Sequence, residues 1–260
     1  MLPTTTPATA KINTTPVTAK DPAGTDAKNP AHSAKKVDLT NSCTISFPAE
    51  KIESASGGLR RDLVRLYRQL RNHYLSAHIA RPAGTSTIEQ TLTELGLELE
   101  AYLTKKHLTF SFERSALQKI FDETVARWNK VVDDVSGNPA DNTVSQAGFC
   151  NCQEHTRLQA AMLPFWFTNA GLTRRILGLS QDFTYGIVNE SMRVSATQSD
   201  AYAMHWNMHN DDRLCEVCLG YGTGGANGYY LMHWFMPAPP PVHYGCRCQY
   251  QIITKQQPQP

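Results

Sequence analysis

Five cysteine and histidine residues in the last quarter of the chain have the spacing of metal ligands. Cys215 and Cys218 form a C-x-x-C pair, and His243, Cys246 and Cys248 form an H-x-x-C-x-C group. Each short spacing lets two side chains converge from one turn, and two such groups separated by a loop are typical of structural zinc sites. The sequence therefore predicts one structural zinc ion, which closes the loop between the groups.

Zinc takes four ligands at tetrahedral angles, so this cluster offers one candidate too many. Our first choice is Cys215, Cys218, His243 and Cys246, with Cys248 as the competitor for the fourth place. Along an extended C-x-C segment both thiols point to the same side, so Cys246 and Cys248 could both bind the ion. His243 would then be a hydrogen-bonding neighbour of the ligands. The sequence leaves both sets open.

The chain holds seven cysteines, an odd count, and six of them lie in three tight pairs. This distribution indicates metal ligands rather than a disulfide framework. The third pair, Cys150 and Cys152, is followed by His155, but no fourth partner stands nearby in the sequence. We interpret this pair as thiols at the start of a helix, although His205 or His209 could complete a second site.

The composition of the chain limits the classes of protein to which it can belong. The chain has 260 residues, 41% of them hydrophobic, and a formal net charge of +2. This suits one or two domains with a real core, and any nucleic-acid contact would have to come from a local patch. No apolar run approaches the roughly 20 residues that cross a bilayer, and no secretory signal is recognisable. We expect a reducing compartment, no membrane partner, and a buried, apolar role for Cys43.

A group of arginines follows one predicted helix. Leu59, Leu63, Leu66, Leu70 and Tyr74 recur at helical spacing. Around them lie five arginines: Arg60, Arg61, Arg65, Arg68 and Arg71. The preferred interpretation is a solvated face that attracts the acidic helix after it. The alternative is a docking surface for phosphates or for an acidic partner.

Periodicity predicts the other elements. Pro82 and Gly84 are expected to end the first helix, and Ser86 with Glu89 forms a capping-box pattern that opens a second. A third helix is expected over residues 113–135, and helical patterning resumes over 153–170, 172–177 and 184–197. The pattern then changes to strands at 203–208, 229–235 and 247–253, with a glycine-rich loop or hairpin at 220–228.

The expected fold is α+β: a mainly α-helical body, a small C-terminal zinc-stapled β module, and a disordered or extended N-terminal arm. The arm is rich in Thr, Ala, Pro and Lys and has few large apolar side chains. The expected domains are 1–40 (low-complexity arm), 41–200 (helical body), 201–255 (Cys/His metal-binding β module) and 256–260 (tail).

Residues 212–218 (DRLCEVC) and 243–248 (HYGCRC), joined by a glycine-containing loop and prolines, resemble a known signature. It is the D-x-R-x-C-x-x-C … H-P-x-C-R-C pattern of phage Mu F-like head morphogenesis proteins, the minor head proteins of tailed bacteriophages. The likeness covers about residues 180–253. Two departures are Tyr244, where the family usually has proline, and residues 219–222 (LGYG), where it has Leu-Asp-Gly.

The resemblance implies a virion protein present in few copies inside the capsid, near the portal vertex, and in the host cytoplasm during assembly. Its partners would be the portal protein, capsid or scaffolding proteins, and packaged DNA. The expected role is head morphogenesis and not catalysis. Two alternatives remain: an enzyme or toxin-like effector, for example an ADP-ribosyltransferase carried on such a module, and a zinc-dependent nucleic-acid-binding protein.

Overall fold

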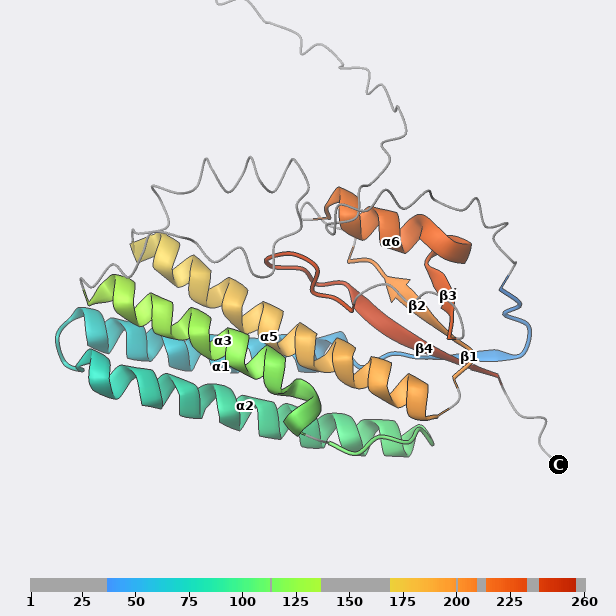
Figure 1. Ribbon diagram of the computed structural model, residues 1–260, viewed down its shortest axis with the longest axis horizontal. Coiled ribbons are helices and arrows are strands. Elements are labelled where there is room, and N and C mark those ends of the chain that lie inside the picture. Colours follow the sequence, from blue (N-terminus) through green and yellow to red (C-terminus); the bar gives the residue numbers. More distant parts are fainter. Residues whose placement is uncertain are drawn as a thin grey trace, which may run out of the picture. The chain divides into compact units, whose positions relative to one another are not determined.

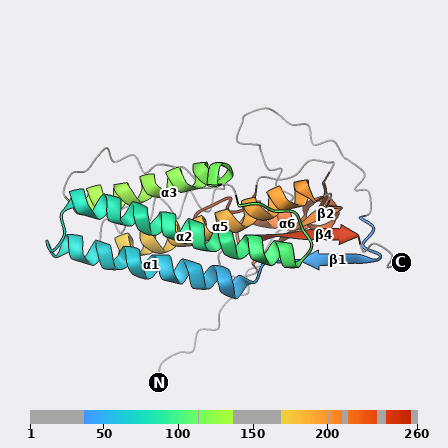
Figure 2. The same cartoon turned by 90° about the horizontal axis from the view of Figure 1, so that it is seen from below.

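The computed structural model describes residues 37–112, 114–136, 169–199, 201–209, 214–232 and 239–255. These residues form helices packed along one another and a four-stranded antiparallel sheet (Figures 1 and 2). The predicted α+β class is therefore confirmed. The predicted arm up to residue 36, the expected helical stretch at 153–168, and Cys150, Cys152 and His155 lie outside the described residues.

The helical body contains α1 (Ala49–Arg71), α2 (Ala77–Lys105), α3 (Arg114–Val135) and α5 (Asn169–Gln198). Buried residues recur every three or four positions and face the core, in α1 as Ile52, Ser56, Leu59, Leu63, Tyr67 and Leu70, and in α2 as Ile88, Leu92, Leu95, Leu99 and Leu103. This spacing keeps one stripe of each helix buried. The third helix agrees closely with the prediction for residues 113–135.

Helix α5 is buried on nearly every side. All residues from 179 to 189 are buried, and α5 packs against α1, α2, α3 and strand β4. We predicted two short helices at 172–177 and 184–197, and this was wrong. A helix surrounded by protein has no polar face, so its apolar residues show no single stripe. Its buried hydroxyls bond back to the preceding turn, as Ser180 does to the carbonyl oxygen of Ile176 at 2.8 Å.

Pro82 and Gly84 do not end the first helix as predicted. Helix α1 already ends at Arg71, and both residues lie inside α2, which begins at Ala77. Gly84 serves close packing, because a Cβ atom there would lie 1.9 Å from Nε1 of Trp128. The same Nε1 donates a hydrogen bond to the carbonyl oxygen of Ala80 at 3.2 Å.

The predicted capping box at Ser86 is also wrong, because Ser86 lies in the middle of α2. The residue before the first turn of α2 is Ser76. Glu89, the second member of the expected box, instead forms an ion pair with Arg114 at the start of α3. The acidic side chain thus links two helices rather than beginning one.

The sheet has the order β1-β4-β2-β3, and all neighbouring strands are antiparallel. Its strands are β1 (Ser42–Ile45), β2 (Ala203–Asn207), β3 (Tyr229–Leu231) and β4 (Gln249–Lys255). Three of them match predicted strands. Strand β1 was not predicted; it comes from before α1 and pairs with β4, Ser42 opposite Lys255. Cys43 on this edge strand is exposed, so its predicted burial is wrong.

Helix α6 (Glu216–Asn227) packs beside β2 and β3. It occupies much of the glycine-rich stretch that we expected to be a loop or hairpin. The expectation fails for residues 220–223, which are helical, while Gly224, Gly225 and Ala226 leave helical geometry. Gly222 allows close packing, because a Cβ atom there would lie 2.2 Å from the side chain of Met208.

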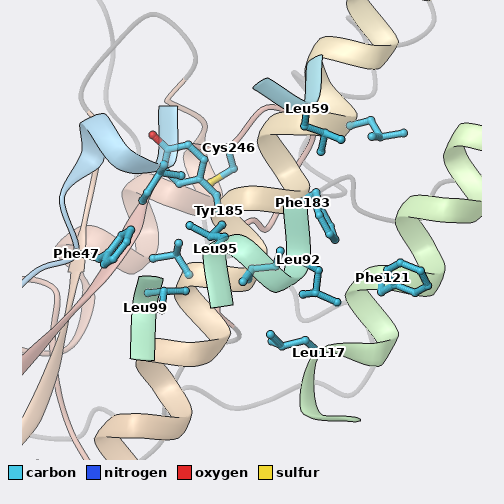
Figure 3. Close-up of a cluster of buried hydrophobic side chains, with 14 of the residues drawn as sticks. Phe47, Leu59, Leu92, Leu95, Leu99, Leu117, Phe121, Phe183, Tyr185 and Cys246 are labelled. Atoms are coloured by element: carbon cyan, nitrogen blue, oxygen red, sulfur yellow. The ribbon is translucent and has the colours of Figure 1, made fainter. Parts of the chain in front are cut away.

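One continuous core joins the helices to the Cys/His segment. Figure 3 shows Phe183 and Tyr185 of α5 among leucines of α1 and α2, with Cys246 beside them. Each of these side chains is almost completely buried. None of the described helices combines the length and apolar character that a membrane span needs.

The contact between Gly84 and Trp128 gives a first prediction. Replacement of Gly84 by alanine should lower the free energy of unfolding by about 2 kcal/mol or more, because the new methyl group must displace the indole ring. Gly58→Ala is the matched control. It also lies in a helix, but its added Cβ would be 3.8 Å from the flexible end of Arg61, so stability should rise by about 0.5–1 kcal/mol. Urea unfolding of both variants measures these changes in the free energy of unfolding. Equal changes in the two variants would contradict the packing role of Gly84.

Candidate metal centre

All five predicted ligand candidates come together in one cluster. The ligand atoms of Cys215, Cys218 and His243 lie within 4.8 Å of one another, and so do those of Cys218, Cys246 and Cys248. Cys218 belongs to both groups and therefore occupies the centre of the cluster. The cluster could bind a metal ion such as zinc.

Two distances within the cluster are short enough for the side chains to share one metal ion. Sγ of Cys218 lies 3.7 Å from Sγ of Cys246, and two thiolates bound to one zinc ion at about 2.3 Å would be about 3.8 Å apart. Nε2 of His243 lies 3.1 Å from Sγ of Cys218. The separations are thus those of ligands around a small ion.

None of the five side chains is more than 3% exposed. Burying so many ionisable groups together is costly unless they are paired or bind a metal. Structural zinc sites are closed, whereas catalytic zinc sites keep one position open to water or substrate.

The electrostatics of the cluster favour one thiolate, at Cys246, because hydrogen bonds with the other cysteines raise the pKa of Cys218 well above its usual range. Against a hydrogen bond with Cys218 that lowers it, a hydrogen bond with Cys246 and burial raise the pKa of Cys248 to about 12. Hydrogen bonds from Cys218 and Cys248 hold the pKa of Cys246 well below its usual range. Burial alone would lower the pKa of His243, but hydrogen bonds and negative charge at Cys215 and Cys246 outweigh it and raise the pKa to about 10. The shifts of Cys246 and His243 together favour a thiolate beside a positive charge, which a bound metal cation would supply.

The start of α6 positions the first two cysteines. Cys215 is the N-cap residue of α6, and Cys218 lies in its first turn. This geometry turns both thiols toward the same point. The exposed amide groups at a helix N-terminus also stabilise negative charge, which lowers the cost of a thiolate there.

A tight turn positions the second group. The backbone N–H of Cys246 donates to the carbonyl oxygen of His243 at 3.1 Å. Gly245 occupies the third position of this turn with φ 72, a left-handed conformation that glycine adopts without strain. The turn brings the side chains of His243 and Cys246 close enough to share one ion.

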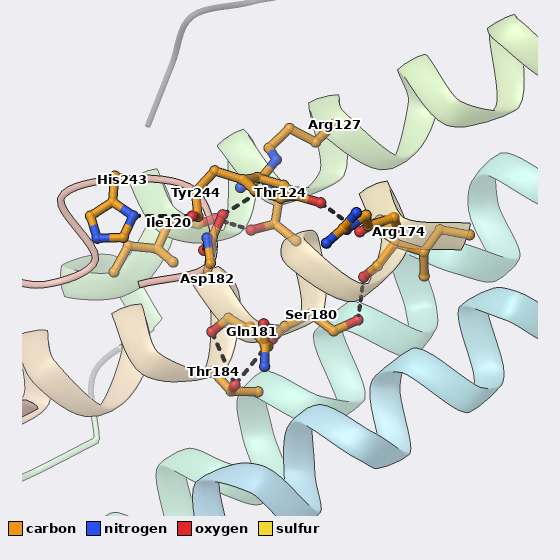
Figure 4. Close-up of polar contacts among 12 residues, drawn as sticks. Ile120, Thr124, Arg127, Arg174, Ser180, Gln181, Asp182, Thr184, His243 and Tyr244 are labelled. Carbon is orange, nitrogen blue, oxygen red and sulfur yellow. Dashed lines mark hydrogen bonds and ion pairs between the residues drawn. The ribbon is translucent and has the colours of Figure 1, made fainter. Parts of the chain in front are cut away.

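Helix α5 binds this turn through a buried carboxylate. Oδ1 of Asp182 accepts the backbone N–H of Gly245 at 2.8 Å, and Oδ2 lies 2.9 Å from the guanidinium of Arg127 (Figure 4). Burial raises the pKa of Asp182 to about 6, against the effect of Arg127, which lowers it. The carboxylate thus connects α3, α5 and the turn.

Tyr244 attaches the same turn to α5 at a second point. Its hydroxyl donates a hydrogen bond to the backbone carbonyl oxygen of Arg174, and its ring lies under the guanidinium of Arg127. Gly178 makes room for the ring, because a Cβ atom there would lie 1.9 Å from Cζ of Tyr244. The residue that departs from the family signature therefore has a packing role in this chain.

Asn189 holds the segment after the turn. Its Nδ2 donates to the carbonyl oxygen of Cys248 at 3.1 Å, and its Oδ1 accepts the backbone N–H of Tyr250 at 2.7 Å. Asn189 is fully buried. Because Asp182 and Asn189 are seven residues apart, they lie on one face of α5, two turns from each other. Together they attach the chain on both sides of Cys246 and Cys248.

Asp182 and Asn189 were not among the predicted site residues. Their only signal was the presence of polar side chains within an otherwise apolar helical stretch, and this signal does not say which backbone groups they bind. His205 behaves as expected for a strand residue: Nδ1 lies 2.8 Å from Oε1 of Gln251, and the ring stacks on Tyr229. The five arginines lie exposed on α1, outside the cluster.

The two hydrogen bonds of Asn189 give a second prediction. Asn189→Ala should lower the free energy of unfolding by about 2–4 kcal/mol, since it leaves two buried backbone groups without partners. Gln198→Ala, at the exposed end of the same helix, is the matched control and should change stability by less than about 0.5 kcal/mol. Chemical denaturation measures both, and an Asn189 variant as stable as the control would refute the attachment.

Comparisons with known proteins identify no relative of this chain. No protein-family model matches it, and neither the curated proteins nor the solved structures contain a match. The resemblance to Mu F-like head morphogenesis proteins therefore stays a prediction from residues 212–218 and 243–248, and the interpretation of the cluster depends on its geometry.

Proposed function

We propose that this protein is a structural component of a phage head and that one zinc ion holds two segments of its C-terminal β module together. The observation that carries the proposal is the buried cluster of four cysteines and His243. The resemblance of its sequence to the minor-head signature supports the head assignment, and the portal, capsid or scaffolding proteins are the proposed partners.

Zinc is the metal that this donor set fits best. Thiolate and imidazole ligands in a small, closed, approximately tetrahedral arrangement are typical of structural zinc. The ion would connect the start of α6 with the turn before β4, two segments that are distant in the sequence. A site so deeply buried has a stabilising role and no catalytic one.

We propose Cys215, Cys218, His243 and Cys246 as the ligands. The tautomer of His243 favours this set: Nδ1 lies 3.1 Å from the carbonyl oxygen of Tyr244, which can only accept a hydrogen bond. Nδ1 therefore carries the proton, and Nε2, which faces Cys218, keeps its lone pair for a metal. Cys248 is then a thiol next to the ion and outside its ligand set.

Metal analysis provides the third prediction. The purified protein should contain about one zinc ion per chain, and a strong chelator should lower its thermal stability. Cys218→Ser should lose the metal, whereas Cys248→Ser should keep it. Cys43→Ser is the control, because Cys43 is exposed and lies on β1.

Two outcomes would count against this assignment. A protein that contains no metal and keeps its fold in chelator has no structural zinc site. If Cys248→Ser loses zinc and His243→Ala keeps it, the zinc site stands but its ligands are the four cysteines. Substitution of cobalt for zinc supports the distinction, since thiolate-to-metal absorption grows with the number of thiolate ligands.

The fourth prediction concerns the particle. Quantitative mass spectrometry of purified heads from the phage whose genome encodes this chain should detect the protein in few copies. Cys218→Ser should reduce its incorporation, and Cys43→Ser should not. Absence of the protein from heads would contradict the proposal, as would NAD-dependent modification of other proteins by the purified chain.

A further inference from the structure

The exposed side of α1 contains an open hollow of about 560 Å³ that four arginines line. Arg60, Arg61, Arg65 and Arg68 come from α1, Tyr74 from the turn after it, and Thr173 from the first turns of α5. The lining of the hollow is therefore strongly basic. It is separate from the Cys/His cluster, with which it shares no residue.

The positive charge in the hollow is largely uncompensated. Among the residues that the structure describes, Arg65 is the one member of the four with an ion pair, to Asp62 at 3.0 Å. Both partners are well exposed, and an ion pair of this kind contributes little. The attraction that we expected between the arginine face and the acidic residues of α2 is not observed there; the ion pair between α1 and α2 involves Lys51 and Glu98.

The chemistry of the hollow fits phosphate groups. The planar guanidinium group donates two parallel hydrogen bonds to a phosphate, and all four cations here are arginines. Arg61, Arg65 and Arg68 lie on one face of α1, about one helical turn of 5.4 Å apart. This repeat is similar to the separation of successive phosphates along an extended nucleic-acid strand. A concave basic surface also concentrates the field on such a ligand.

Tyr74 favours a single strand over a duplex or an acidic protein. Its side chain is 82% exposed at the rim of the hollow, where an unpaired base could stack on the ring. A protein partner would be expected to bury an apolar centre. Val64 is the one aliphatic side chain among the residues that line the hollow.

We propose that this hollow binds single-stranded nucleic acid, with phosphates on Arg60, Arg61, Arg65 and Arg68 and a base on Tyr74. The site goes beyond the structural role proposed above and depends neither on the zinc ion nor on the particle. If the zinc site or the role in the phage head is refuted, the nucleic-acid site is unaffected. If the nucleic-acid site is refuted, the zinc site and the role in the phage head are unaffected.

Fluorescence anisotropy with a labelled mixed-sequence DNA oligonucleotide tests the site and is the fifth prediction. Affinity should fall as salt rises, with a slope of log K against log salt of about −2 to −3 if three or four phosphates are contacted. Arg61→Gln/Arg65→Gln should weaken binding and make that slope about 1.4 less steep. Lys105→Gln/Lys119→Gln, which removes equal charge from exposed positions on other helices, should change little.

Tyr74→Ala separates stacking from charge. It should weaken binding about tenfold and leave the salt slope unchanged, because it removes a stacking contact and no cation. Circular dichroism should show that these surface variants keep their fold. The proposal is overturned if the arginine variant binds as tightly as the parent chain, if polyglutamate displaces the oligonucleotide at equal charge concentration, or if a duplex binds equally well and Tyr74→Ala has no effect.

Discussion

The burial of α5 on nearly all sides is the constraint on which the rest of the structure depends. Helix α5 packs against α1, α2 and α3, and it also contacts β4 and β2. Most of the polar side chains that a helix in this position buries need hydrogen-bond partners within the protein. Asp182 and Asn189 bind backbone groups of Gly245, Cys248 and Tyr250. The same hydrogen bonds that satisfy the helix therefore place the Cys/His turn.

These attachments to α5 explain how such a small sheet can be stable. Strand β3 has three residues and β1 has four, so the strands alone offer little area for a core of their own. Trp206, Tyr250 and Ile252 instead belong to one buried cluster with residues of the helices. A metal ion at Cys218 and Cys246 would add a further link, between α6 and the turn before β4. Helix α5, the sheet and the cluster thus stabilise one another.

The sequence predicted those features that depend on local spacing. The cysteine and histidine pattern brought five ligand candidates together correctly, because C-x-x-C and H-x-x-C turns converge on a point whatever surrounds them. The regular stripe of α3 gave nearly exact bounds.

Features that depend on distant parts of the chain could not be predicted in the same way. Gly84 resembles a helix terminator until Trp128 is known to lie on it, and α5 resembles two short helices until its neighbours on all sides are known. Strand β1 and the exposure of Cys43 depend on a pairing with β4. The roles of Asp182 and Asn189 require knowledge of which backbone groups lie opposite.

The pairing of β1 with β4 has a consequence for how the chain reaches this fold. Ser42 lies opposite Lys255, so the sheet joins residues from nearly opposite ends of the described chain. During synthesis β1 has no partner until β4, the last strand, has emerged, and such non-local pairing slows folding. Through that interval the free strand edge is open to other chains, and its Cys43 thiol is open to oxidants. The helical body could form early, but closure of the sheet would be a late event that depends on the whole chain.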